Sequence, residues 1–150
     1  MALSVAVLGG CGTDHPAGRA TSPPSRVGSA PVALPTSSLA CPDATGLEMI
    51  RDGMLIAGPF TATPQRDAGG SIEHKVWLAS QRAGTDPATL VLVPPDGSEP
   101  RQYTRPGGAA SAPGYAQFFP GLVDIPVPGA WRFYVTVGPD VMCFVVRFSA

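Results

Sequence analysis

The sequence predicts an all-β protein: an immunoglobulin-like antiparallel β-sandwich preceded by a disordered N-terminal segment. Near the C-terminus, apolar and polar residues alternate, which is the period-two pattern of a strand with one buried face. Several short strand-like segments are separated by Gly, Pro and Asp turn signals, a spacing that is typical of sandwiches. After Ala40, no stretch shows the 3.6-residue period of an amphipathic helix.

The predicted strands are short and follow one another closely. In chain order they are Met54–Ala57 with a continuation over Phe60–Thr63, Ile72–Ser80, Thr89–Val93, Arg101–Thr104, Leu122–Val127, Trp131–Val137 and Val141–Phe148. The sequence Pro94-Pro95-Asp96-Gly97 predicts a turn, because Pro presets φ and Gly permits positive φ. Residues 107–114 are predicted as an exposed loop, and Pro126 favours an edge strand or an extended connector over Leu122–Val127.

The last two strands have the clearest alternation, and a Gly138-Pro139-Asp140 turn separates them. One face of each strand is apolar: Trp131, Phe133, Val135 and Val137 in the first, and Met142, Phe144, Val146 and Phe148 in the second. We expect both of these faces to lie in the core of the domain.

The chain divides into three parts: a lipoprotein-type signal remnant with its lipidation site (1–11), a linker (12–40) and the sandwich domain (41–150). The linker consists largely of Pro, Ser, Thr, Ala and Gly and contains no aromatic residue. It therefore buries too little apolar surface to offset the entropy of ordering. We predict that it is a disordered spacer.

The first eleven residues end in the pattern Leu8-Gly9-Gly10-Cys11, after an apolar stretch from Met1. An apolar run with a small-residue exit is the end of an export signal, and a cysteine directly after it is the residue that lipoproteins acylate. The stretch is short and has no Lys or Arg before it, so the alternative is a buried strand over Ser4–Leu8. It is also too short to span a bilayer, which needs about 20 apolar residues. We expect lipidation of Cys11 and a place outside the cytoplasmic membrane.

Three cysteines are an odd number, which in an exported protein requires an explanation. Lipidation of Cys11 leaves Cys41 and Cys143, at opposite ends of the predicted domain, as a disulfide pair. Closing a loop of about 100 residues contributes roughly 4–5 kcal/mol in the chain-entropy model, and such bonds persist in oxidising compartments. The alternative is two unpaired, partly buried thiols. Cys41 lies too far before Trp77 for the cysteine–tryptophan spacing of an antibody domain.

Composition and motifs exclude several classes of function. The net charge is −1, and no basic patch of the kind that binds nucleic acid or anionic lipid is present. The chain also lacks a nucleophile elbow, a phosphate loop and zinc-type cysteine or histidine spacing. His74 beside Glu73 or Asp67 is a candidate general base, but a lone strand histidine flanked by charges is usually solvated. We expect no cofactor, no metal and no catalytic activity.

Two binding sites are suggested by the residues that remain. Aromatic side chains with polar neighbours form a candidate platform for a sugar or a protein partner: Tyr103, Arg105, Tyr115, Gln117, Phe118 and Phe119. The alternative is that Phe118 and Phe119 close one end of the sandwich. A second candidate is a copper site, since thioether and imidazole ligands suit copper; its residues are Met49, Met54, His74 and Met142.

The chain resembles a group of uncharacterised bacterial, actinobacterial-like secreted or lipoprotein domains over most of residues 45–150. The resemblance rests on these segments: Lys75-Val76-Trp77-Leu78, Leu90-Val91-Leu92 before the Pro-Asp-Gly hairpin, Phe119-Pro120-Gly121, Pro126-Val127-Pro128-Gly129-Ala130-Trp131 and Phe144-Val145-Val146-Arg147-Phe148. This chain has Ala130 where that group usually has cysteine, and Cys143 is the candidate disulfide partner instead. The resemblance implies an immunoglobulin-like sandwich and no known activity.

We therefore expect a monomeric, lipid-anchored protein of the cell envelope with a non-catalytic recognition or structural role. Its expected partners are the membrane, through the lipid, and an envelope protein or glycan. The alternative is an extracytoplasmic carrier of a small ligand or copper, and a third hypothesis is an envelope enzyme. A carrier needs a concave pocket with convergent polar groups. A recognition module needs an exposed apolar patch, and an enzyme needs titratable groups that meet in a cleft.

Overall fold

A computed structural model describes residues 40–61, 65–66, 70–110 and 113–149. The predictions for the signal, for Cys11 and for the linker up to residue 39 lie outside the described residues. The described part is all β, without a helix, which confirms the predicted fold class. It contains ten strands: β1 (Ile50–Asp52), β2 (Leu55–Gly58), β3 (Gln65–Arg66), β4 (Ile72–Ser80), β5 (Ala88–Val93), β6 (Arg101–Arg105), β7 (Gly108–Ala109), β8 (Gln117–Ile125), β9 (Gly129–Val137) and β10 (Asp140–Phe148).

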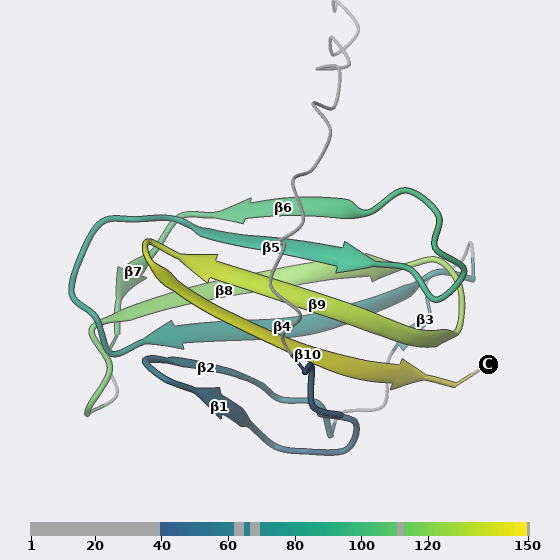
Figure 1. Cartoon of the computed structure of the whole chain (residues 1–150), viewed down its shortest axis with the longest axis horizontal. Helices are drawn as coiled ribbons and strands as arrows, with labels where there is room; N and C mark the ends of the chain where they lie inside the picture. Colours follow the sequence, from purple (N-terminus) through teal and green to yellow (C-terminus); the bar gives the residue numbers. More distant parts are fainter. Residues whose placement is uncertain (1–39, 62–64, 67–69, 111–112, 150) are drawn as a thin grey trace, which may run out of the picture.

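The strands form two antiparallel sheets that face each other (Figure 1). One sheet has the order β1-β2-β4-β8-β7, with β3 also paired to β4, and the other has the order β10-β9-β5-β6. Immunoglobulin domains have the sheet orders A-B-E-D and G-F-C, with C′ added in the variable type. Here β2, β4, β8 and β7 occupy the first set of positions, and β10, β9, β5 and β6 occupy the second. The strand order is therefore immunoglobulin-like.

The core lies between the two sheets and is built from alternate residues of the long strands. The inward faces predicted for β9 and β10 are confirmed, because all eight of their side chains are at most 4% exposed. They pack against the inward residues of β4 and β8, among them Val76, Leu78 and Phe119. Phe133 and Phe144 stack with their ring centroids 5.1 Å apart, which joins the two halves of the last hairpin.

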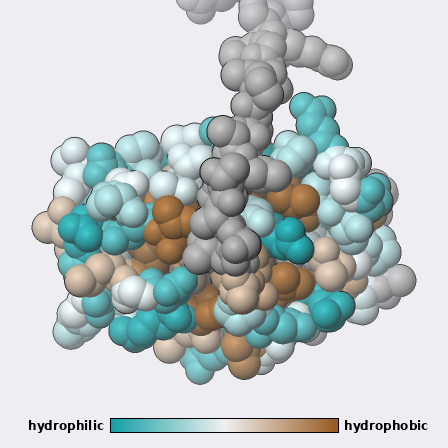
Figure 2. All heavy atoms as spheres, viewed as in Figure 1, coloured by the Kyte–Doolittle hydropathy of each residue, from teal (hydrophilic) through white to brown (hydrophobic). Residues whose placement is uncertain are grey.

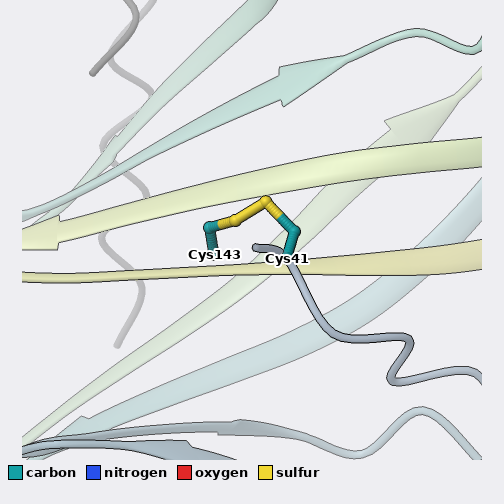
Figure 3. Close-up of a disulfide and its surroundings, with 2 residues drawn as sticks. All are labelled: Cys41 and Cys143. Atoms are coloured by element: carbon teal, nitrogen blue, oxygen red, sulfur yellow. A yellow bond between two sulfur atoms is a disulfide. The ribbon is translucent and has the colours of Figure 1, made fainter. Parts of the chain in front are cut away.

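A disulfide joins Cys41 to Cys143 on β10, with the two Cα atoms 5.0 Å apart, as the cysteine count predicts (Figure 3). The segment after Cys41 lies along the outer edge of β10. Val145 there donates its N–H to the carbonyl of Pro42 and accepts a hydrogen bond from the N–H of Ala44. These bonds occupy backbone groups that an edge strand would otherwise present to another chain.

Strand β8 differs from its prediction as an edge strand or connector over Leu122–Val127. It has nine residues, begins at Gln117 and pairs with β4 along its whole length (Figure 1). Pro126 lies after the strand, whereas Pro120 lies within it. Leu122 and Asp124 direct backbone groups away from β4, toward side chains of β6. By the alternation of backbone groups along a strand, the nitrogen of Pro120 lies on the same outer edge, where its missing N–H costs no bond to β4.

Two smaller differences concern loops. The predicted loop over 107–114 contains the two-residue strand β7, which pairs with the start of β8. Phe60 and Thr61 do not continue β2 as a strand; Phe60 instead packs in the core. The turn predicted at Asp96 and Gly97 is confirmed, since Gly97 has a φ of 73° and donates its N–H to the carbonyl of Pro94.

Candidate recognition surface

The outer face of β4 and β8, turned away from the core, carries side chains that are not typical of a solvated sheet. Along β4, Ile72, His74, Val76 and Leu78 point inward, so Glu73, Lys75, Trp77 and Ala79 point outward. Cross-strand neighbours share a face of a sheet. The outward partners on β8 are Phe118 opposite Ala79, Pro120 opposite Trp77, and Leu122 opposite Lys75.

Four of these side chains form a continuous apolar strip, which we define as Trp77, Phe118, Pro120 and Leu122. The rings of Trp77 and Phe118 contact each other at a tilt of 41°, with centroids 6.0 Å apart. Leu122 is 55% exposed and Phe118 is 37% exposed. Isolated exposed apolar residues are ordinary on a protein surface, whereas a contiguous group on one face marks an interaction site.

One end of the apolar strip is closed by a contact between Arg51 on β1 and Tyr115, in the segment before β8. The guanidinium of Arg51 donates a hydrogen bond of 3.0 Å to the hydroxyl of Tyr115. Ile56 and Ala79 lie on the same face, between these two residues in the sheet. Their exposed fractions are 2% and 3%, although they point away from the core.

The other end of the apolar strip is bordered by two cations, Lys75 and Arg105, which line an open groove of about 460 Å³ with Pro120, Gly121 and Leu122. Arg105 comes from β6 and donates a hydrogen bond of 2.7 Å to the carbonyl of Leu122. Its guanidinium also lies 5.2 Å from the ring centroid of Tyr103, a geometry that favours a cation–π interaction. Arg105 is thereby held in place before any ligand binds.

Gly121 is the residue that lets Arg105 lie so close to β8. A Cβ built on Gly121 would lie 3.0 Å from Nε of Arg105 and 3.5 Å from the carbonyl oxygen of Val76. The Nε atom itself is buried and has no hydrogen-bond partner. Arg105 can therefore occupy this position only because Gly121 has no side chain.

The structure separates the six residues of the predicted aromatic platform. Arg105, Phe118 and Tyr115 contribute to the surface described above. Phe119 is 1% exposed and belongs to the core, so the prediction that it is an exposed platform residue is wrong. Successive residues of a strand point to opposite faces, and therefore Phe118 and Phe119 cannot both be exposed or both be buried in this strand.

The remaining two members, Tyr103 and Gln117, support the backbone instead. The hydroxyl of Tyr103 accepts a hydrogen bond of 3.3 Å from the N–H of Asp124, which joins β6 to the free edge of β8. Gln117 is buried, and its side-chain amide donates a hydrogen bond to the carbonyl of Gly84. Both polar groups are engaged in contacts with the backbone.

His74 is buried, contrary to the expectation that it is solvated. It is 3% exposed and lies between Phe60 and Phe148, with ring centroids 6.1 Å and 5.1 Å away. The flanking charges misled the prediction, because Glu73 and Lys75 point outward and His74 points inward. Burial lowers the pKa of the His74 imidazole, since the charged form is poorly solvated in the core. Nε2 has no hydrogen-bond partner, and the ring lies inside the sandwich rather than in a cleft.

The four residues of the predicted copper site do not come together. His74 lies six residues from Ser80, about 20 Å along β4, and Met54 lies at the Ser80 end, where its carbonyl accepts the N–H of Gln81. Met142 lies six residues from Phe148, the residue on β10 that contacts His74. Met49 and Met54 are each 46% exposed, whereas Met142 is fully buried. The hypothesis of a copper site at these residues is therefore wrong.

Within the described ranges, no three His, Cys, Asp or Glu side chains are grouped so that they could hold a metal ion. The same part of the chain has no helix long and apolar enough to cross a membrane. Its carboxylate–cation pairs lie on the surface and join separate segments: Arg82 with Asp140, Arg101 with Asp124, and Arg147 with Asp43. None of these pairs includes Lys75 or Arg105.

Several residues of this surface are not among the site residues that the sequence predicts: Arg51, Lys75, Trp77, Pro120 and Leu122. A signal for Trp77 exists in the sequence itself. In Ile72–Ser80 the alternate residues Ile72, Val76 and Leu78 define the inward face, so a tryptophan in the opposite register lies on the outside. Together with the outward-facing apolar residues of β8, Trp77 forms the contiguous group that indicates a binding surface.

No protein-family model matches the chain, and neither curated proteins nor solved structures show a significant similarity to it. The resemblance to secreted and lipoprotein domains therefore stays a prediction.

Proposed function

We propose that the protein is a lipid-anchored recognition module of the cell envelope, with a non-catalytic sandwich domain that binds its partner through the apolar strip. The observation that carries this proposal is the contiguous outward group of Trp77, Phe118, Pro120 and Leu122 on β4 and β8. The outer face of a fully solvated sheet usually carries polar side chains, whereas here Trp77 and Phe118 contact each other on that face.

The placement outside the cytoplasmic membrane is supported by cysteine usage. A disulfide between Cys41 and Cys143 fits an oxidising compartment. It leaves Cys11 as the third cysteine, and Cys11 follows an apolar stretch with a Gly-Gly exit. Lipidation at Cys11 gives this odd thiol a role and anchors the domain at the membrane surface.

Intact-mass measurement on protein from a native membrane fraction tests the anchor and the disulfide together. We expect the mass of a diacylglyceryl group on Cys11 and a gain of two hydrogen atoms on reduction. An unmodified chain with three free thiols would contradict the proposed location.

Binding of the full chain to an isolated envelope preparation tests the recognition surface. We expect Trp77→Ala to lose most of the binding, because it removes the largest side chain of the apolar strip. Tyr134→Ala is the matched control, since Tyr134 is an outward-facing, half-buried aromatic residue on β9 of the opposite sheet. Equal binding by both variants and the unchanged protein would refute a role for this face.

A further inference from the structure

We propose that the ligand of this surface is an acidic polysaccharide, whose carboxylates bind Lys75 and Arg105 while its sugar rings lie on Trp77 and Phe118. This inference rests on the proposed recognition function and names the class of ligand. Four observations carry it: the two cations, the fixed position of Arg105, the adjoining aromatic rings and the occupied backbone groups on the edges of β8 and β10.

The two cations lie at the same groove and are available to an anion. Lys75 is exposed, and its cross-strand neighbour is Leu122, whose carbonyl accepts the hydrogen bond from Arg105. Neither cation forms an ion pair with a carboxylate in the described part of the chain. A guanidinium has five N–H donors, so the single bond to Leu122 leaves donors for a carboxylate.

Arg105 is preorganised, which favours binding at an exposed site. A flexible arginine loses conformational entropy when a ligand fixes it. Here the hydrogen bond to Leu122 and the Tyr103 ring already hold the Arg105 side chain. Gly121 leaves the room that this position needs. Glu73 lies two residues from Lys75 on the same face of β4. Because its negative charge repels an anion, we expect the ligand carboxylate on the side of Lys75 that faces Arg105.

The aromatic part of the surface continues directly from the cations. From Lys75 to Ala79 the outward face of β4 extends for about 13 Å, with Trp77 in the middle and Phe118 opposite Ala79. Aromatic faces stack on the apolar faces of sugar rings. A chain of acidic sugars supplies both a ring and a carboxylate at regular intervals, which matches a surface with cations at one end and rings at the other.

The strand edges argue against an acidic peptide added as an extra strand. On β8, the carbonyl of Leu122 and the N–H of Asp124 are already bound to side chains of β6. On β10, residues Pro42 and Ala44 occupy the edge at Val145. Main-chain bonds to a free edge give such a peptide its affinity, and at these positions the edge groups are already occupied.

Binding of the full chain to oligogalacturonate, measured by calorimetry, tests the inference, with dextran as the neutral glycan and poly-glutamate as the acidic peptide. We expect oligogalacturonate to bind, dextran to bind weakly and poly-glutamate not to bind. Lys75→Gln and Arg105→Gln should each weaken oligogalacturonate binding about tenfold, as expected for the loss of one charge-assisted bond. Binding should also fall in 0.5 M salt, because exposed charges are screened.

Arg132→Gln is the matched control, because Arg132 is an exposed cation on β9 of the opposite sheet without an ion-pair partner in the described chain. Lys75→Gln changes an exposed side chain and should unfold at the same temperature as the unchanged protein. No oligogalacturonate binding, poly-glutamate binding of equal strength, or an equal loss in Arg132→Gln would each overturn the inference. If Trp77→Ala loses binding to the envelope preparation while Lys75→Gln keeps it, the proposed function stands and the acidic ligand is refuted.

Discussion

At the scale of single residues, His74 links protonation to stability. Its ring is enclosed by Phe60 and Phe148, and burial holds its pKa below the ordinary value of 6.5. Well above pH 6.5 the imidazole is neutral in both the folded and the unfolded chain, so it adds no dependence on pH. Below pH 6.5 the unfolded chain binds a proton that the folded chain resists, and the free energy of unfolding falls.

We expect His74→Phe to remove this pH dependence between about pH 6.5 and 5. The unchanged protein should lose at most about 1.4 kcal/mol per pH unit in this range, whereas the variant should stay level, because phenylalanine packs between the same rings and does not titrate. Urea unfolding at pH 7.5, 6 and 5 measures the difference. Parallel curves for the two proteins would show that His74 is not the group responsible.

The carboxylate of Asp43 acts in a separate and more acidic range. Hydrogen bonds from Thr45, and then from Arg147, lower the pKa of Asp43 to about 2 from 3.8. A carboxylate with a lowered folded pKa stabilises the protein above the unfolded pKa, and this contribution disappears as pH falls from 3.8 toward 2.

We therefore expect Asp43→Asn to flatten the decrease in melting temperature between about pH 4 and 2. Thermal unfolding followed by circular dichroism across that range is the measurement. Asp52→Asn is the control, because Asp52 is an exposed carboxylate on β1 that forms no ion pair among the described residues. An equal effect of both substitutions would assign the acid sensitivity to net charge rather than to the contacts of Asp43.

At the scale of elements, the last residue of β2, Gly58, lies in close contact with the backbone of residues 48 and 49. A Cβ on Gly58 would lie 2.3 Å from the carbonyl oxygen of Glu48, a backbone atom that cannot rotate away. Gly58 pairs with Trp77, so this close approach also lies beside the apolar strip. The passage of residues 48 and 49 over β2 therefore requires a residue without a side chain.

We predict that Gly58→Ala destabilises the domain by about 1–3 kcal/mol, the usual range for forced overpacking. Gly84→Ala is the matched control, since the nearest atoms to a Cβ there are 3.9 Å away. Chemical unfolding of both variants gives the comparison. A Gly58→Ala protein as stable as the control would mean that the segment at Glu48 shifts without cost.

The alternation of inward-facing and outward-facing residues predicts the long strands and their buried faces. Strand β4 has the predicted bounds, and the inward faces of β9 and β10 are confirmed. The same period-two pattern places His74 inside and Trp77 outside, whereas the charges beside His74 favour a solvated side chain. For β8, Pro126 predicts an edge strand or connector over Leu122–Val127, but the strand spans Gln117–Ile125, because a proline is tolerated at an outward-facing edge position such as Pro120.

The candidate surface was less predictable than the fold because it is assembled from distant segments. Arg105 reaches Leu122 across the gap between two sheets, and Arg51 reaches Tyr115 across two intervening strands. No local pattern encodes which strands become neighbours. The number of cysteines, by contrast, predicted the pairing of Cys41 with Cys143, because it depends on counting rather than on geometry.

At the scale of the whole molecule, the disulfide closes almost the entire domain. Cys41 and Cys143 are separated by 102 residues, so reduction releases a long loop in the unfolded chain. We expect the Cys41→Ser/Cys143→Ser variant to be about 2–5 kcal/mol less stable than the oxidised protein. Unfolding in guanidinium with and without reductant measures the difference. Equal stability of oxidised and reduced protein would contradict a bond between these two residues.

The same bond has a mechanical consequence. Tension applied to the chain before Cys41 passes through the sulfur atoms into the middle of β10, in parallel with the backbone that leads to β1. Peeling the first residues of the domain from the N-terminal side therefore also has to shear β10 from β9, a pair with nine matched positions. The disulfide therefore couples the first residues of the domain to the central part of the β9–β10 hairpin.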